Sequence, residues 1–257
     1  MADFCKAELD GHVLVVTINR PEVMNALHSA AHFELDEIFN AFEADPEQWV
    51  AIVTGAGDKA FSAGNDLKWQ AQGGTMDRPA SGFAGLTERF GMQKPVIAAV
   101  NGLAMGGGFE IALACDLIVA AENAFFALPE PRVGLAALAG GLHRLPRQIP
   151  LKQAMGMILT GRRVMAEEGY RLGFVTEVVG EGEALTAARR WAAQILECSP
   201  VSIRTSKDVV MRGLDIANYQ EAYKHPYDSV QVLRNSEDFV EGPLAFSEKR
   251  APDWKGR

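Results

Sequence analysis

Four runs of β-branched and apolar residues, bounded by turn-forming residues, predict buried strands. They cover residues 12–18, 49–54, 95–100 and 117–121. Between the first two runs, apolar positions at helical spacing predict a helix over 28–44, which Asp45 and Pro46 end. Strands that alternate with helices are typical of an α/β fold with much parallel pairing, and this is the fold class that we predict.

The pattern changes after about residue 181, where no further strand is predicted. Three more helices are expected, over 183–197, 201–213 and 217–233. Breaks are expected at Ser199-Pro200 and at Gly242-Pro243. We therefore predict a core of residues 1–195 and a helical region of residues 196–257. A helical tail of this kind buries little by itself, so we expect it to pack on the core or on another subunit.

One segment inside the core, residues 70–85, is dominated by Gly, Pro, Ser and Thr. A long segment without helix or strand in a compact domain is often a functional lid. An ordinary surface loop is the alternative interpretation, and the sequence leaves both open.

The composition narrows the class of protein. The 257 residues, 48% of them hydrophobic, suit one large domain or one domain with a helical appendage. The net charge of -8 disfavours general nucleic-acid binding, which needs Lys and Arg to neutralise phosphates. The sequence contains no run of about 18 apolar residues, so we expect no membrane span. Three widely spaced cysteines fit a reducing compartment, so we expect a cytoplasmic protein with neither nucleic acid nor membrane as partner.

Several common motifs do not fit. The glycines at 106–108 are not a dinucleotide fingerprint, because Ile111 stands where that motif needs Gly or Ala. No phosphate-binding P-loop, serine-hydrolase elbow or HExxH motif occurs. His28 and His32 are four residues apart on the predicted helix, and without a third ligand we predict a solvated face, not a metal pair. Cys115 is predicted to be a buried thiol.

Three segments carry candidate chemistry: 59–67 (KAFSAGNDL), 95–110 (PVIAAVNGLAMGGGFE) and 126–134 (FALPEPRVG). In the second, a strand leads into three glycines and then a helix. Glycines let a ligand approach the backbone, and the N–H groups at a helix start have no intrahelical partner. These donors can stabilise negative charge that develops on a carbonyl oxygen. Glu110 lies in the first turn of the same helix, close to that charge.

These segments resemble the crotonase (enoyl-CoA hydratase/isomerase) superfamily. The resemblance covers essentially the whole chain, from 19–21 and 25–27 to 246–250. It implies a spiral of repeated ββα units for the core, and C-terminal helices that build homotrimers, often paired into homohexamers. The stretches SAGNDLK, GGGFEIAL, FALPE and the final SEDFVEGPLAFSEKRAPDWKGR are most similar to the carnitinyl-CoA dehydratase (crotonobetainyl-CoA hydratase) branch.

The resemblance also implies roles for individual residues. The oxyanion-hole donors would be the backbone N–H groups of Asn65 and Gly107, and the acid/base pair would be Glu110 and Glu130. The positions that match coenzyme A contacts are Ala63, Leu67, Met24, Phe246 and Lys249, the last two for the cofactor of a neighbouring subunit. Leu138 would make the acyl pocket more apolar. Arg20 would compensate for Glu22, which stands where relatives often carry Lys.

The activity implied by the resemblance is reversible addition of water to a 2-enoyl-CoA thioester. Glu110 would activate the water and Glu130 would protonate C2. Coenzyme A enters as part of the substrate, and this chemistry needs neither a metal nor a prosthetic group. The alternatives are carnitinyl-CoA dehydration, enoyl-CoA isomerisation, in which one carboxylate shuttles a proton between C2 and C4, and binding of CoA thioesters without catalysis.

Overall fold

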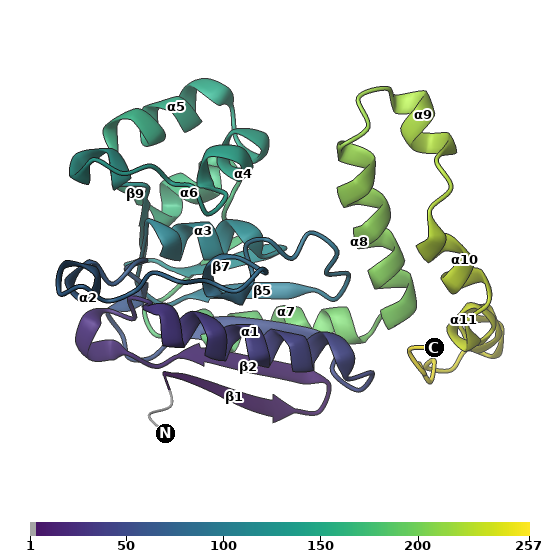
Figure 1. Ribbon diagram of the computed structural model, residues 1–257. Coiled ribbons are helices and arrows are strands. Elements are labelled where there is room, and N and C mark those ends of the chain that lie inside the picture. Colours follow the sequence, from purple (N-terminus) through teal and green to yellow (C-terminus); the bar gives the residue numbers. More distant parts are fainter. Residues whose placement is uncertain (1–3) are drawn as a thin grey trace.

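The computed structural model describes residues 4–257 and has a mixed α/β architecture (Figure 1). Its main sheet has six strands in the order β1-β2-β3-β5-β7-β10. Their bounds are β1 Cys5–Asp10, β2 Val13–Ile18, β3 Val50–Gly55, β5 Val96–Val100, β7 Leu117–Ala121 and β10 Glu177–Val179. β1 pairs antiparallel with β2, and all other pairs are parallel. The predicted α/β class with parallel pairing is confirmed.

Helices cover both faces of this sheet, which explains the continuous apolar runs of its central strands. β3 and β5 are buried along their whole length. On one face, Val15, Ile52 and Ile97 pack under α7 (Ala184–Leu196). On the other face, alternate residues such as Val53 and Ala98 share a core with α1 (Ser29–Ala44) and α3 (Gly107–Ala114).

A second sheet of four short strands determines where the candidate site lies. Its order is β4-β6-β8-β9, with bounds Ala60–Ser62, Leu103–Met105, Phe125–Ala127 and Val164–Met165. β4, β6 and β8 run parallel, so their carboxyl ends meet at one edge. The candidate catalytic residues of segments 59–67, 95–110 and 126–134 follow β4, β6 and β8, respectively. The topology therefore brings them together.

Short helices surround this edge. They are η1 (Pro21–Val23), α2 (Leu67–Ala71), η2 (Phe83–Gly85), η3 (Glu130–Val133), α4 (Gly141–Gln148), α5 (Leu151–Thr160) and α6 (Ala166–Leu172). Residues 70–85 are less uniform than predicted, because α2 continues to Ala71 and η2 is buried against α1. Only the part between them is an extended surface loop.

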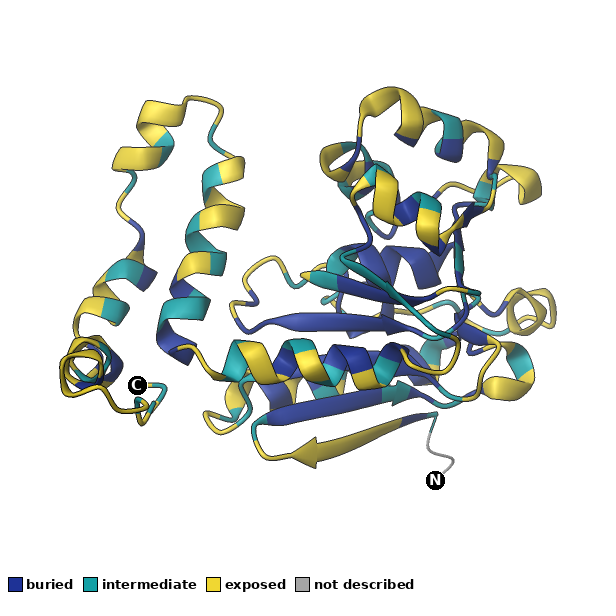
Figure 2. Cartoon of the chain, turned by 180° about the vertical axis from the view of Figure 1, so that it is seen from behind, coloured by how far each residue is buried: buried dark blue, intermediate teal, exposed yellow. Residues whose placement is uncertain are grey.

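The last helices stand beside the core, and Figure 2 shows that much of their surface is exposed. They are α8 (Pro200–Leu214), α9 (Tyr219–Lys224), α10 (Asp228–Arg234) and α11 (Glu237–Glu248). The chain end folds back on them, since Asp238 Oδ1 accepts from the Lys255 N–H at 2.8 Å and Trp254 donates to the Glu197 carbonyl at 2.9 Å.

Two predictions for the last helices were wrong, and six strands were not predicted, namely β1 and the short strands β4, β6, β8, β9 and β10. The helix expected over 217–233 is two helices, because the residue before Pro226 leaves the helical conformation. The break expected at Gly242-Pro243 does not occur, and Pro243 lies inside α11. β1 was missed because it is an edge strand with mostly exposed side chains, so it lacks an apolar run.

The close approach of β4 and α3 gives a stability prediction. A Cβ added to Gly108 would lie 2.0 Å from the Ser62 carbonyl oxygen, which is backbone and cannot rotate away. We expect Gly108→Ala to lower the free energy of unfolding by about 2 kcal/mol or more. The matched control is Gly156→Ala in α5, where the added Cβ meets nothing within 4 Å. We expect this control to be neutral or stabilising by up to about 1 kcal/mol. Urea titration at one protein concentration measures both, and equal losses would contradict the packing account.

Candidate active site

The segments after β4 and β6 meet through their glycines. A Cβ on Gly64 would lie 2.7 Å from the Gly107 nitrogen and 2.8 Å from the Met105 carbonyl oxygen. Gly64 also has a φ of 86°, a conformation that other residues rarely adopt. Glycine is therefore required at this position twice over, by space and by backbone conformation. The contact places Asn65, the next residue, beside the start of α3.

The backbone N–H groups of Asn65 and Gly107 have no hydrogen-bond acceptor within residues 4–257. The segment around Asn65 is fixed by its neighbours, since the Leu27 N–H donates to the Gly64 carbonyl at 2.7 Å and the Asp66 N–H donates to the Leu27 carbonyl at 2.9 Å. The Gly107 N–H points from the first turn of α3, where helices leave donors unpaired. Two pre-positioned donors of this kind can bind an oxyanion.

Arg20 stabilises the segment around Asn65 by pairing with the next residue, Asp66, so its guanidinium is not available for a ligand. Its guanidinium forms an ion pair with Asp66, with 3.0 Å between Nη2 and Oδ2, and also donates to the Ala26 carbonyl. Both side chains are at least nine-tenths buried. The expectation that Arg20 compensates for Glu22 at a phosphate is therefore wrong. Asp66 in turn caps α2, accepting from the Trp69 N–H at 3.1 Å.

Glu110 projects from α3 into a buried position. Its Oε1 accepts from the Gly141 N–H at 2.8 Å, so the start of α4 holds the carboxyl group in place. Burial raises the pKa of Glu110 to about 7, and the hydrogen bond from Gly141 opposes part of that rise. The nearby charge of Glu130 raises this pKa further. Glu110 therefore changes protonation close to neutral pH.

Glu130 approaches from the segment after β8. A Cβ on Gly106 would lie 2.7 Å from its Oε1, so the carboxyl group lies against the glycine run. Its Oε2 is buried and has no hydrogen-bond partner within residues 4–257. Burial raises the pKa of Glu130 as well. A raised pKa favours the protonated form of a carboxyl group, which can donate its proton to a reacting atom.

The aromatic ring of Phe83 closes one side of the glycine run. A Cβ on Gly107 would lie 2.4 Å from the tip of this ring. His32 packs edge-on against the same ring, with 4.4 Å between the ring centres. Neither contact was predicted, because Phe83 lies in the segment 70–85, for which the sequence left a lid and a surface loop both open.

The two histidines of α1 do not lie on a solvated face, so that prediction was wrong. His28 is 5% exposed and caps α1 by accepting from the Ala31 N–H, and His32 is fully buried. Spacing alone shows that two residues share a helix face, but not which face is buried. Cys115 is buried, as predicted.

The residues expected to contact coenzyme A lie in two places. Met24, Ala63 and Leu67 lie near the free N–H groups, and the Ala63 N–H donates to the Met24 carbonyl at 2.9 Å. Met24 and Leu67 are 41% and 44% exposed, which leaves them accessible to a ligand. Phe246 and Lys249 lie at the far end of the molecule on and beside α11 (Figure 1), so one chain does not bring the two groups together.

Leu138 is 74% exposed in the loop between η3 and α4. The residues of this loop that face inward are Ala137 and Ala139, which are buried. Within this chain, the small side chains of Ala137 and Ala139 therefore pack inward from the loop, and the side chain of Leu138 points outward.

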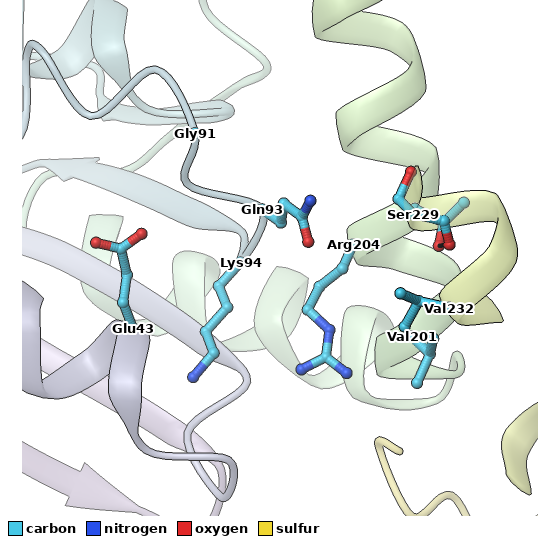
Figure 3. Close-up of a pocket in the computed structure, with 9 residues that line it drawn as sticks. Glu43, Gly91, Gln93, Lys94, Val201, Arg204, Ser229 and Val232 are labelled. Carbon is cyan, nitrogen blue, oxygen red and sulfur yellow. Dashed lines mark hydrogen bonds between the residues drawn. The ribbon is translucent and has the colours of Figure 1, made fainter. Parts of the chain in front are cut away.

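Other features of the described residues do not compete with this site. A cavity of about 280 Å³ lies between the core and α8 and α10 (Figure 3), but Glu110 and Glu130 do not line it. Among residues 4–257, no cluster of three His, Cys, Asp or Glu side chains could hold a metal ion. No helix in this range is long and apolar enough to cross a membrane.

Several known proteins are similar to this chain in both sequence and fold. The enoyl-CoA hydratase/isomerase family model matches residues 8–257. A carnitinyl-CoA dehydratase from Escherichia coli is 47% identical over 256 residues, which cover 96% of this chain and 97% of that protein. The crystal structure of an enoyl-CoA hydratase from Mycobacterium tuberculosis is 37% identical, with a TM-score of 0.91 over 99% of both chains. That of a carnitinyl-CoA hydratase from Mycobacterium avium is 40% identical, with a TM-score of 0.80 over 100% of both chains.

The glycine-lined backbone donors, the carboxyl pair beside them and the match along almost the entire sequence agree with one another. The chain belongs to the enoyl-CoA hydratase/isomerase (crotonase) family.

Proposed function

We propose that this protein adds water reversibly to 2-enoyl-CoA thioesters, which makes it a hydro-lyase. One observation carries the proposal. Two free backbone N–H groups, of Asn65 and Gly107, lie beside two buried carboxyl groups with raised pKa values, of Glu110 and Glu130. A thioester carbonyl between the two donors would place the conjugated double bond next to the two carboxyl groups.

The reaction can be written from these four groups. Ionised Glu110 takes a proton from water as the water oxygen bonds to C3 of the thioester. The electron pair of the double bond moves toward the carbonyl oxygen, where the Asn65 and Gly107 N–H groups stabilise the enolate. Protonated Glu130 then delivers its proton to C2. The net result is one water added and one proton moved from Glu130 to Glu110, and exchange with solvent restores the starting state.

Coenzyme A would be bound from two sides. Met24, Ala63 and Leu67 are close to the donors and would contact the cofactor, Ala63 and Leu67 at its adenine. Phe246, which is 86% exposed, and Lys249 would reach the cofactor of a neighbouring subunit. Their distance from the donors within one chain supports this arrangement. No part of this chemistry requires a metal or a prosthetic group.

Several substrates and activities of the family are alternatives for this protein. The name carnitinyl-CoA dehydratase, borne by the E. coli relative, makes crotonobetainyl-CoA one named option. Enoyl-CoA isomerisation needs only one dominant carboxylate, and the pairing of Glu110 with Glu130 favours hydration over it. A protein that only binds CoA thioesters would have no use for two buried carboxyl groups, which cost stability.

For assembly we propose a homotrimer or a dimer of trimers built by residues 196–257. This helical region exposes many apolar side chains, which a subunit contact would cover. They include Val210, Met211, Leu214, Val232, Phe239, Val240 and Leu244. We also propose a cytoplasmic location, which suits its three free cysteines.

Substitution of the two carboxyl groups tests the proposed activity. Glu110→Gln and Glu130→Gln keep the shape of each side chain but remove its acid/base function. We expect each to lower kcat for crotonyl-CoA hydration by at least about a hundredfold. Loss of the conjugated-thioester absorbance measures the rate. The control is Glu122→Gln, which changes an exposed glutamate outside the site and should retain full activity. Full activity in both site variants would refute the two-carboxyl mechanism.

The burial of Glu110 gives a second prediction that needs no substrate. Its pKa rises from 4.5 in the unfolded chain to about 7 in the folded protein. The folded state is therefore favoured below pH 4.5, and this advantage is lost as the pH rises through 7. We expect Glu110→Gln, which cannot ionise, to become progressively more stable than the unmodified protein between pH 5 and pH 8, by about 3 kcal/mol at most. Urea titration across this pH range measures the difference, and a difference independent of pH would contradict the buried position.

The assembly proposal predicts the mass in solution. Light scattering after size-exclusion chromatography should give three or six times the chain mass of 27.8 kDa. Val240→Glu, on the exposed face of α11, should lower this mass, because a carboxylate in an apolar subunit contact is costly. A monomer in the unmodified protein would contradict the proposal.

A further inference from the structure

The ring of His32 contains a buried hydrogen-bond donor without a partner. The Ala84 N–H donates to Nδ1 at 3.0 Å, so the proton of the neutral ring is on Nε2. Burial lowers the pKa of His32 to about 4, which keeps the ring neutral at pH 7. Within residues 4–257, Nε2 has no hydrogen-bond partner, although the side chain is fully buried. Because such a donor costs stability, a ligand atom that accepts from it is a physical reason for its presence.

This donor lies one aromatic ring away from the proposed reaction centre. The His32 ring contacts the Phe83 ring, and the tip of Phe83 lies against Gly107, one of the two oxyanion donors. The Phe83 ring therefore links His32 to the oxyanion donors by two direct contacts. The mechanism proposed above makes no use of His32.

Arg78 brings a positive charge to the same region. Its side chain is exposed and forms neither an ion pair nor a hydrogen bond within residues 4–257. Burial is the main influence on the pKa of both Glu110 and His32, and the charge of Arg78 lowers both pKa values. Glu110 is on α3 and His32 is on α1, so the guanidinium lies within electrostatic range of both elements.

The loop that carries Arg78 is anchored on both sides. Before it, the Thr75 carbonyl accepts from Trp69 Nε1 at 3.1 Å and from Ser29 Oγ at 2.7 Å. After it, the Ser81 hydroxyl donates to the Asp36 carboxylate. These anchors attach the loop to α2 and α1, so Arg78 is held near the site and does not depend on closure of a long free segment.

We propose that Arg78 and the Nε2–H of His32 recognise an anionic group, a carboxylate, at the end of the acyl chain away from the thioester. The inference rests on the proposed function and names the class of its substrate. A guanidinium and a neutral N–H donor suit a carboxylate, because both groups donate and one carries the opposite charge. A trimethylammonium group would be repelled by Arg78 and has no acceptor for His32.

Three thioesters of similar shape test this specificity. Glutaconyl-CoA ends in a carboxylate, crotonyl-CoA in a methyl group and crotonobetainyl-CoA in a trimethylammonium group. We expect the highest kcat/KM for glutaconyl-CoA. Arg78→Gln should lower the ratio of kcat/KM for glutaconyl-CoA over crotonyl-CoA by about ten- to a hundredfold. Any effect of this variant through the pKa of Glu110 acts on both substrates and cancels in the ratio. Arg171→Gln, which removes an exposed arginine of α6, is the matched control and should leave the ratio unchanged.

His32→Phe removes the donor while keeping an aromatic ring, and should lower the same ratio by about tenfold. If this variant does not fold, Arg78→Gln still decides the question. A preference of the unmodified protein for crotonobetainyl-CoA, or an unchanged ratio in Arg78→Gln, would overturn the anionic-substrate inference while hydration of crotonyl-CoA still supports the proposed function.

If the proposed function is wrong, none of the three thioesters will be hydrated. In that case, calorimetry with saturated thioesters tests recognition of the terminal carboxylate without any reaction. Glutaryl-CoA should bind more tightly than butyryl-CoA, and Arg78→Gln should remove the difference. Equal affinities of the unmodified protein for the two probes would overturn it.

Discussion

The close approach of backbone to backbone at the carboxyl ends of β4, β6 and β8 is the constraint on which the site depends. Gly64 meets the nitrogen of Gly107, and Gly108 meets the carbonyl of Ser62, at distances that leave no room for a side chain. Parallel pairing of the three strands puts their ends at one edge. The two free N–H groups and Glu130 come from the segments that follow these strands, and Glu110 comes from the helix that begins there. A shift of any one strand would separate the donors from the acids.

This geometry also sets the electrostatics. The packing that exposes two N–H groups buries the carboxyl groups of Glu110 and Glu130, and burial is what raises their pKa values. The Gly141 N–H holds Glu110 and limits its rise, whereas Glu130 Oε2 has no partner within the described part of the chain. The two acids therefore differ in their surroundings, as an acid/base pair needs. Arg20 and Asp66 stabilise the segment from outside and leave the reacting region to the backbone donors.

The sequence predicted what depends on local pattern. The central strands were found because helices cover both faces of their sheet and give them continuous apolar runs. β1 was missed because its exposed residues have no such run. The break before Pro226 was missed because apolar spacing continues on both sides of it, and the break expected at Pro243 does not occur because α11 tolerates a proline at an exposed position. Glu110 and Glu130 were found through the family resemblance. The buried states of His28 and His32, the place of Phe83 over Gly107 and the reach of Arg78 depend on tertiary contacts between distant segments, which spacing along the chain does not reveal.

The most direct test of the central claim is a crystal structure of the protein with butyryl-CoA, a saturated thioester that cannot be hydrated. We expect the thioester oxygen to lie about 3 Å from the nitrogens of both Asn65 and Gly107. We also expect C2 and C3 to lie between the carboxyl groups of Glu110 and Glu130. A thioester bound elsewhere, such as in the cavity between the core and α8, or with its oxygen turned away from both N–H groups, would contradict it.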